Sequence, residues 1–308
     1  MSKILVVGTV AFDEIITPFG ETGKILGGSA SYISMAAAKI NPDVGIVSVI
    51  GNDFPDAYLQ KFLDRSINID GIKKMSDEKT FYWKGKYHND LNKRDTLATE
   101  VNCLAHFNPI VPQAYKNADF LMLGNLHPSI QQSVIDQMEE RPKLIALDTM
   151  NFWMDTAWDD LINVLKNIDI LIINDEEARQ LSKEYSLVRA AKTIQEMGPK
   201  YLIIKKGEHG ALLFHGKNIF FAPALPLEDV YDPTGAGDTF AGGFIGRLAK
   251  IGDISFDAMK NAVICGSNLA SFTVEQFGTE RIESLEKQEM KSRLQDFINL
   301  THFEIELA

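Results

Sequence analysis

The sequence contains little cysteine and no excess of positive charge. Its two cysteines, Cys103 and Cys265, lie far apart without a C-x-x-C pair, so the pattern indicates neither a disulfide framework nor a cysteine zinc site. The 31 Lys and Arg residues are outnumbered by 42 Asp and Glu residues, and the net charge of −11 disfavours nucleic acid and anionic membranes as partners. We therefore expect a globular protein of a reducing cytoplasm.

The sequence also lacks long apolar runs and two common nucleotide motifs. No run approaches the roughly 18 apolar residues of a membrane span, and the N-terminal "MSKILVVGTV" is typical of a buried strand rather than a signal peptide. The first apolar run continues into "GTVAFD" instead of G-x-G-x-x-G, and no G-x-x-x-x-G-K-[ST] occurs. These absences disfavour a nicotinamide-dependent dehydrogenase and a P-loop enzyme.

Short β-branched runs alternate with helical patterns along most of the chain. This alternation predicts an α/β fold with a doubly wound, mostly parallel sheet flanked by helices, and such sheets bind ligands at the carboxyl ends of their strands. No repeat or linker-like stretch interrupts the chain, so we expect a single domain over residues 1–308. The runs are 3–8, 44–51, 120–125, 143–148, 169–174 and 201–207, and the helical patterns are 29–39, 55–65, 129–139, 156–166, 176–182 and 187–197.

Two segments, residues 10–26 and 80–104, break this alternation. They carry alternating aromatic and polar residues, so we expect them to form the strands of a small second sheet that acts as a lid. Its aromatic residues could stack on a nucleobase or sugar ring, or could form the apolar face of a homodimer joined lid to lid. These residues are Phe12, Phe81, Tyr82, Trp83 and Tyr87.

The stretch "DPTGAGDTFAGGF", residues 232–244, combines very small residues with two aspartates. Gly235, Ala236 and Gly237 leave successive backbone amides uncovered just before an apolar helical pattern. Free amides at a helix start, together with the helix dipole, bind phosphate oxygens. The sequence therefore predicts an anion hole with the carboxylate of Asp238 at its rim.

Asp238 is the candidate general base. At a helix N-terminus we expect it to remain ionised, with a pKa near the usual value of about 3.9, and so to be a weak base. A weak base suffices for phosphoryl transfer, because the transition state is loose and the acceptor proton leaves late.

Several motifs of the chain resemble those of the ribokinase family, also called the PfkB family of sugar and nucleoside kinases. Residues 232–244 match its second signature almost position for position, and "ILGGSASYISMAAAKI" (25–40) resembles its first. Four further segments, which extend the resemblance over most of the chain, are "VVGTVAFDEI" (6–15), 47–72, "NDEEA" (174–178) and "KKGEHGALL" (205–213).

The resemblance implies a role for each matching residue. Asp238 would be the base, with Gly235, Ala236 and Gly237 as the anion hole, and Asn174 and Glu177 would organise a hydrated Mg²⁺. The expected substrate contacts are Asp13, Gly27 and Gly28. The expected ATP contacts are Asn174, Lys206, Gly207, Gly210 and Asn268, and a monovalent cation such as K⁺ would lie near Asp232, Thr234, Thr273 and Gly278.

The chain departs from the family pattern where the acceptor would bind. Tyr32 replaces the usual Asn of the first signature, and "LDTMNFW" (147–153) replaces the common D-x-N-x-R string, so Tyr32 and Asn151 become candidate substrate contacts. The lid also has a basic edge that includes Arg94. This edge could hold the phosphate of a sugar phosphate, or it could consist of solvated charges.

The resemblance implies an ATP-dependent kinase that transfers the γ-phosphoryl group to a hydroxyl of a sugar or nucleoside. Two alternatives stay open: a sugar-phosphate kinase of the phosphofructokinase type, and a catalytically silent sugar or nucleoside sensor on the same fold. The intact Gly-Ala-Gly-Asp stretch, residues 235–238, argues against a sensor, because a sensor does not need a proton acceptor beside an anion hole.

Overall fold

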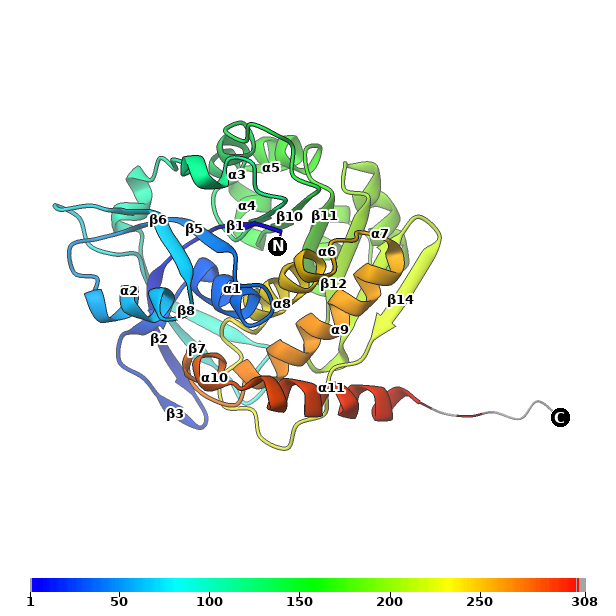
Figure 1. Ribbon diagram of the computed structural model, residues 1–308. Coiled ribbons are helices and arrows are strands. Elements are labelled where there is room, and N and C mark those ends of the chain that lie inside the picture. Colours follow the sequence, from blue (N-terminus) through cyan, green and yellow to red (C-terminus); the bar gives the residue numbers. More distant parts are fainter. Residues whose placement is uncertain (1, 303, 305–308) are drawn as a thin grey trace.

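The computed structural model describes residues 2–302 and 304, and its main element is a nine-stranded sheet (Figure 1). The strand order is β14-β13-β12-β11-β10-β9-β1-β5-β6, and the seven strands from β12 to β6 run parallel. The parallel strands are β1 (Ile4–Val7), β5 (Val44–Ile50), β6 (Ile67–Lys74), β9 (Phe120–Leu123), β10 (Leu144–Asp148), β11 (Ile170–Asn174) and β12 (Tyr201–Lys205), and the antiparallel hairpin is β13 (Ala211–His215) and β14 (Asn218–Ala222).

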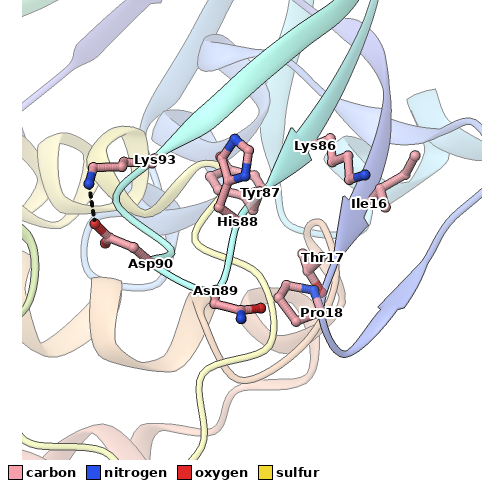
Figure 2. A pocket seen from close by; sticks show the side chains of 9 residues that line it. All are labelled: Ile16, Thr17, Pro18, Lys86, Tyr87, His88, Asn89, Asp90 and Lys93. Carbon is pink, nitrogen blue, oxygen red and sulfur yellow. Dashed lines mark ion pairs between the residues drawn. The ribbon is translucent and has the colours of Figure 1, made fainter.

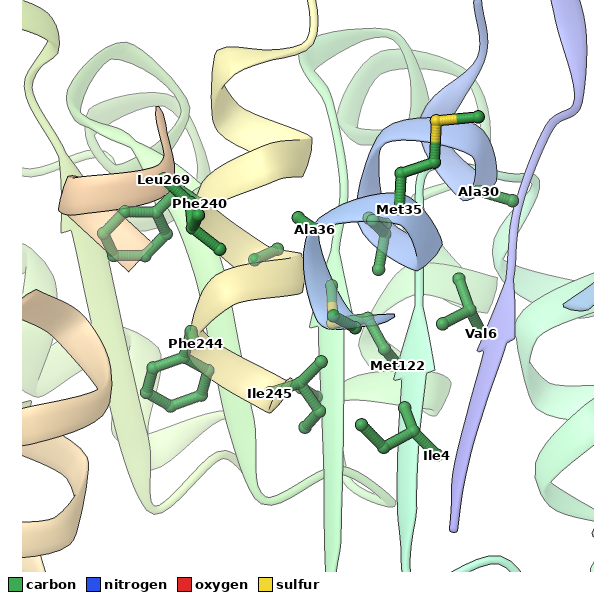
Figure 3. Close-up of a cluster of buried hydrophobic side chains, with 14 of the residues drawn as sticks. Ile4, Val6, Ala30, Met35, Ala36, Met122, Phe240, Phe244, Ile245 and Leu269 are labelled. Carbon is green, nitrogen blue, oxygen red and sulfur yellow. The ribbon is translucent and has the colours of Figure 1, made fainter. Parts of the chain in front are cut away.

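Helices cover both faces of this sheet, which confirms the doubly wound α/β fold predicted from the sequence. One face packs against α1 (Ser29–Ala38), α8 (Ala236–Ile251) and α9 (Phe256–Thr273), as Figure 3 shows for part of the core. The other face packs against α3 (Pro128–Ile135), α5 (Trp158–Leu165), α6 (Asp175–Ser182) and α7 (Leu187–Glu196). The continuous Val, Ile and Leu runs of the central strands follow from this burial on both faces.

A second, smaller sheet forms from the two segments that break the alternation, as predicted. It pairs β2 (Ala11–Thr17) with β3 (Gly20–Glu21), β4 (Ile25–Gly27) and β7 (Tyr82–Tyr87), and β7 pairs with β8 (Arg94–Glu100). Asp13 on β2 lies opposite Trp83 on β7, and Glu14 lies opposite Lys84. Because side chains alternate along a strand, Asp13 and Trp83 share one face of this sheet and the Glu14–Lys84 ion pair lies on the other.

Some element boundaries differ from those predicted. The helix predicted over 156–166 is α5, and a short additional helix, α4 (Asn151–Thr156), precedes it and is separated from it by the non-helical Ala157. Strand β6 and the β13–β14 hairpin were not predicted from the sequence; the hairpin turn contains Gly216, which has the positive φ typical of such turns. No helix within the described residues is long and apolar enough to cross a membrane.

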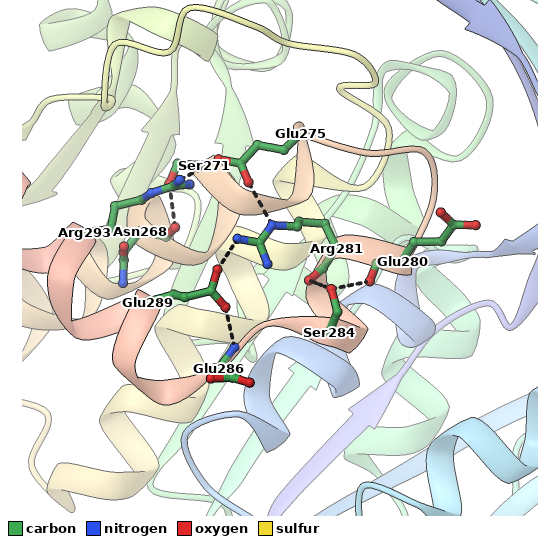
Figure 4. A network of polar contacts seen from close by, with 9 residues as sticks. All are labelled: Asn268, Ser271, Glu275, Glu280, Arg281, Ser284, Glu286, Glu289 and Arg293. Atoms are coloured by element: carbon green, nitrogen blue, oxygen red, sulfur yellow. Dashed lines mark hydrogen bonds and ion pairs between the residues drawn. The ribbon is translucent and has the colours of Figure 1, made fainter.

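The C-terminal helices close the structure below α9. A guanidinium network joins α10 (Glu280–Ser284) and α11 (Lys287–Thr301) to the end of α9, as Figure 4 shows. Arg281 and Arg293 both pack on the ring of Phe272, and both pair with Glu275. The network therefore fixes the turn at 274–279, whose Val274 carbonyl accepts the amides of Tyr231 and Asp232 just before the glycine-rich segment.

The close packing of α8 depends on its paired glycines. A Cβ atom on Gly242 would lie 2.3 Å from the carbonyl oxygen of Ile33 in α1, and one on Gly243 would lie 3.0 Å from the Cα of Gly266 in α9. The helix can therefore pass between α1 and α9 only because these residues lack side chains. This packing sets the position at which α8 begins.

We predict that Gly242→Ala destabilises the protein by about 1–3 kcal/mol, because the added methyl group meets backbone atoms that cannot move alone. Urea unfolding measures the change. The matched control is Gly23→Ala, where a Cβ would meet nothing within 4 Å. Equal unfolding free energies for the two variants would contradict the proposed packing role.

Candidate active site

Three neighbouring strands bring polar side chains to one edge of the main sheet. Asp148, Asn174 and Lys205 are the last residues of β10, β11 and β12. Each continues the alternation of the buried residues that face α1, α8 and α9, such as Ala146, Ile172 and Ile203. All three side chains therefore lie on the face from which α8 starts.

The loop before α8 is held by Asp232, which is fully buried. Its carboxylate accepts the amide of Thr234 at 2.8 Å and the amide of Gly278 at 3.0 Å. The chain then turns at Gly235, whose φ of 74° lies in the left-handed region. Any Cβ there would lie 2.4 Å from the ring of Tyr32, so only glycine fits.

The start of α8 presents free amides, although not the predicted set. The amide of Ala236 donates to the carbonyl of Pro233 at 3.2 Å and is already used. Among the described residues, none accepts a hydrogen bond from the amides of Gly235, Gly237 and Asp238. The amides without an acceptor are therefore those of Gly235, Gly237 and Asp238, whereas the predicted set was Gly235, Ala236 and Gly237.

The carboxylate of Asp238 lies at the rim of these amides and is half-buried. Burial raises its pKa to about 7, and the nearby charges of Asp148 and Asp13 add to the rise, while Lys205 and Arg94 oppose it. The expectation of an ordinary carboxylate pKa is therefore wrong. A raised pKa makes Asp238 a stronger base than a solvated aspartate.

Asp13 lies in the predicted substrate region together with both glycines of the first signature. Burial raises its pKa to about 7, while the backbone amide of Gly28 and the charge of Arg94 lower it. A Cβ on Gly27 would lie 2.0 Å from the carboxylate of Asp13, so glycine is needed there. Tyr32, in contrast, is buried, and its hydroxyl has no hydrogen-bond partner among the described residues.

Asn174 and Glu177 form a reciprocal cap at the start of α6. The Asn174 side chain accepts the amide of Glu177, and the Glu177 side chain accepts the amide of Asn174, each at 2.8 Å. Burial raises the pKa of Glu177 to about 7, with a further rise from Asp148 and a decrease from Lys205. The cap uses only one carboxylate oxygen of Glu177, so the other oxygen can face a hydrated cation.

Magnesium fits this set of oxygens. Asp148, Glu177 and Asp238 influence one another as like charges, and a divalent cation would relieve that repulsion. Within the described residues, no three Asp, Glu, His or Cys side chains converge closely enough to hold a metal alone. Water and phosphate oxygens would therefore complete the shell, as Mg²⁺ prefers.

The nucleotide side is only partly as predicted. Gly207 and Gly210 have positive φ angles of 55° and 82° in the turn after β12, and the Lys206 amide donates to the Gly210 carbonyl. The lysine that lies beside the carboxylate cluster of Asp148, Glu177 and Asp238 is Lys205, which was not predicted from the sequence. Strand alternation could have identified it, had the face covered by α8 been known.

Two predicted contacts form hydrogen bonds to other parts of the protein. Asn268 is buried between α9 and α11, where its side-chain amide donates to the Met290 carbonyl at 3.1 Å. Its contact with ATP stays a prediction. Asn151 belongs to α4, and its amide donates to Gln180 of α6.

The residues predicted to surround K⁺ are only partly together. Asp232, Thr234 and Gly278 share the hydrogen bonds described above, whereas Thr273 donates to Thr239 on α8 at 3.0 Å. These contacts explain the segment without an ion, so the K⁺ site stays a prediction.

The lid contacts this edge through the last residue of β7 and through the loop between β7 and β8. Thr234 donates to the hydroxyl of Tyr87 at 3.1 Å, and Asn92 donates to Glu208 at 2.8 Å. Arg94 lies over the ring of Trp83, 5.4 Å from its centroid, and its charge acts on Asp13, Glu177 and Asp238. The Arg94 guanidinium therefore faces these three carboxylates from the side of the lid.

Most other basic groups of the lid are paired within it. Lys84 pairs with Glu14, His88 with Asp95, and Lys93 with Asp90. The last two pairs are near a hollow of about 540 Å³ at the end of the lid, which Figure 2 shows. This hollow contains none of the residues predicted for catalysis. Lys86 lines the same hollow and has no ion-pair partner among the described residues, so Lys86 and Arg94 are the cations of the basic edge that lack an acidic partner.

Together, the fold and this edge define a phosphotransferase built on a ribokinase-like α/β scaffold. A family model described as pfkB family carbohydrate kinase matches residues 1–286. The chain therefore belongs to the pfkB family of carbohydrate kinases, whose members phosphorylate hydroxyl groups.

Known relatives and solved structures agree with this assignment. The chain is 29% identical to a cytidine kinase of Thermococcus kodakarensis, over 81% of this chain and 90% of the relative. Its fold matches a nucleoside kinase of Methanocaldococcus jannaschii with a TM-score of 0.78 and 21% identity, over 96% and 99% of the two chains. An E. coli protein provisionally named ribokinase II, solved with ATP and Mg²⁺, matches with a TM-score of 0.77 and 21% identity, over 97% and 100%.

The raised pKa of Asp238 predicts a pH-dependent stability difference. The group holds its proton more tightly in the folded state, with a pKa near 7, than in the unfolded state, near 3.8. Between these values the unfolded state ionises first, so folding loses stability as pH rises, and the loss is complete above 7.

We therefore expect Asp238→Asn to leave stability unchanged at pH 4 and to raise it by roughly 1–3 kcal/mol at pH 7.5, since one pKa unit corresponds to about 1.4 kcal/mol. Thermal unfolding of the metal-free protein measures the difference. Asp159→Asn, in the exposed first turn of α5, is the control and should show no such trend. A difference that does not grow with pH would contradict the raised pKa.

Proposed function

We propose that the chain is an ATP-dependent nucleoside kinase in which Asp238 is the general base and the amides of Gly235, Gly237 and Asp238 form the anion hole. The observation that carries the proposal is the position of a carboxylate with a pKa near 7 beside three amides without acceptors. An acceptor hydroxyl between them would meet a proton acceptor and an anion site at once.

The reaction follows from this arrangement. The acceptor oxygen forms a bond to the γ-phosphorus as the bond between that phosphorus and ADP breaks, and the acceptor proton passes to Asp238. The amides bind the phosphoryl oxygens on which negative charge is spread. At neutral pH about half of Asp238 is ionised in the empty protein, so kcat/KM should rise through this pH range.

ATP with Mg²⁺ is the proposed phosphoryl donor. Glu177 and Asn174 would hold the metal through water, on the side of the cluster that faces β11. Bound there, Mg²⁺ would offset the charge of the phosphates. Asp148 completes this acidic side, where Lys205 is its partner at 3.7 Å.

Asp13 is the proposed contact for the hydroxyls of the acceptor. Its buried carboxylate shares one face of the lid sheet with Trp83 and is held by the Gly28 amide. A carboxylate can accept hydrogen bonds from two adjacent hydroxyls, as a ribose ring presents them.

The charges of the lid favour a neutral acceptor over a sugar phosphate. Lys84, His88 and Lys93 have acidic partners, and Arg94 faces the catalytic carboxylates rather than a separate anion site. Of the remaining cations on the β7–β8 hairpin, a phosphorylated acceptor would find only Lys86 without an ion pair among the described residues.

Aromatic surface near the same edge favours a nucleobase. Trp83 lies on the lid face that carries Asp13, and Phe152 at the start of α4 is 53% exposed. Trp153 beside it donates to Asn125, which follows β9. Flat rings of this kind stack on bases. The similarity to a cytidine kinase agrees with this reading.

Assembly through the lid remains a proposal of the same kind. The edge strand β8 exposes Leu97, with 51% of its surface accessible, and a second copy would cover it. Sedimentation of the purified protein tests this dimer directly.

We predict that Asp238→Asn lowers kcat by at least about 10²-fold, because general base catalysis contributes 10²–10⁴-fold in rate. ATP affinity, measured by calorimetry, should change by less than about threefold, since the amides remain. Asp159→Asn again serves as the control. A variant with near-normal turnover would remove Asp238 from the role of base.

We also predict that, among nucleosides, pentoses, hexoses and hexose phosphates, a nucleoside gives the highest kcat/KM in an ATP-consumption assay. Arg94→Ala should lower kcat for that nucleoside, because the guanidinium faces the catalytic carboxylates. A hexose phosphate as the best substrate, with an increase in its KM in Arg94→Ala, would favour the sugar-phosphate alternative. No turnover of any acceptor by the wild-type protein would favour the sensor.

A further inference from the structure

Lys205 is placed next to the anion hole by strand register and by a glycine. It pairs in register with Asn174 at the end of β12, and its side chain is 18% exposed. Its Nζ atom lies 2.9 Å from the point that a Cβ on Gly237 would occupy. Any other residue at 237 would therefore displace the ammonium group, so the glycine makes room for it beside a free amide.

The ammonium group has incomplete partners. The Nζ atom lies 3.7 Å from the nearer oxygen of Asp148, which is longer than the 2.7–2.9 Å of a charge-assisted hydrogen bond. At this distance from Asp148, the Nζ atom makes no hydrogen bond to a described residue, although an ammonium group has three donors. Burial alone would lower the pKa of Lys205, but attraction to Asp148, Glu177 and Asp238 raises it, so the group carries its charge.

The Lys205 ammonium group and the free amides at the start of α8 therefore all have hydrogen-bond donors without acceptors. An anion with several oxygens can bind between them, and the proposed reaction brings a phosphoryl group to this position. A compact point charge suits a phosphoryl group, whose three equatorial oxygens share the charge of the transition state.

We propose that the Nζ atom of Lys205 contacts the phosphoryl group during transfer, beside the Gly237 amide, and that Lys205 is a catalytic residue in addition to Asp238. This inference rests on the proposed function, because it needs a γ-phosphoryl group at the start of α8. The chain carries a second lysine one residue later, but Lys206 belongs to the turn and its backbone bonds to Gly210.

The competing role is structural: Lys205 could serve only to neutralise Asp148. An ion pair built for that purpose would close to hydrogen-bond distance. Here the ammonium group is displaced from Asp148 towards Gly237. The two roles also predict different values of kcat for a double variant that lacks the charges of both Asp148 and Lys205.

The first experiment compares Lys205→Met, Lys205→Arg and the control Lys217→Met, which removes an exposed lysine in the β13–β14 turn. We expect Lys205→Met to lower kcat about 10²–10³-fold, as loss of one donor to a transition-state anion does, with the KM of the acceptor unchanged within about threefold. Lys205→Arg should recover part of kcat, and Lys217→Met should match the wild type. A Lys205→Met enzyme with normal kcat would overturn the proposal.

The second experiment measures binding without any acceptor. Calorimetry with ADP and with β,γ-methylene-ATP should show that Lys205→Met keeps its ADP affinity within about twofold but binds the triphosphate analogue about tenfold more weakly. Equal loss for both nucleotides would show that Lys205 does not act on the terminal phosphoryl group, and would overturn the proposal.

A double variant separates the catalytic role from charge balance. If Lys205 acts on the phosphoryl group, Lys205→Met combined with Asp148→Asn should fold as stably as Asp148→Asn alone but remain about as slow as Lys205→Met. If it only neutralises Asp148, the double variant should regain the kcat of Asp148→Asn, which would overturn the proposal. Failure of the proposed function is separate, because it would appear as absent nucleoside turnover in the wild type, while the nucleotide-binding comparison needs no acceptor.

Discussion

The excess of negative charge at one edge of the sheet is the constraint on which the site depends. Burial in a water-poor region raises the pKa values of Asp13, Asp148, Glu177 and Asp238, and the charge of Asp148 raises those of Glu177 and Asp238 further. Lys205 and Arg94 offset only part of this charge. The empty site can relieve the rest by holding protons. Under the proposed function, ATP would bring further negative charge to this edge, and a divalent cation would offset it. The same surplus would then account both for the pKa near 7 of the proposed base and for a requirement for Mg²⁺.

The helices that hold these charged groups in place pack so closely that only glycine fits at several contacts. Gly242 and Gly243 let α8 lie against α1 and α9, Gly235 passes over the ring of Tyr32, and Gly237 leaves room for Lys205. Four glycines of one short segment therefore have four different neighbours. Behind them, the stacked guanidinium groups of α10 and α11 fix the turn that binds the residues before Gly235 (Figure 4). Helix packing and catalysis are linked here through the position of the first turn of α8.

The sequence predicted the parts of this protein that depend on local chemistry. The parallel sheet, the strands of the small sheet and the glycine-rich start of α8 each follow from a pattern within a few residues. The pKa of Asp238 could not be predicted in that way, because its neighbours Asp13, Asp148 and Lys205 come from distant parts of the chain. Lys206 was preferred to Lys205 because only the structure tells which face of β12 lies against α8. The contact between Asn268 and α11 could not be predicted for a similar reason, since nothing near Asn268 in the sequence reveals that α11 packs there.

The lid explains how such a charged site can work in water. Tyr87 accepts a hydrogen bond from Thr234, two residues before α8 begins, and Asn92 bonds to Glu208, three residues after Lys205. The lid is therefore bonded to both segments that are proposed to contact the phosphoryl group. The lid also holds Asp13 and Arg94, so the proposed acceptor contact and a second positive charge lie on the same element. Electrostatic interactions strengthen as water is excluded. A lid bound at these two points therefore both completes the site and shields its charges from water.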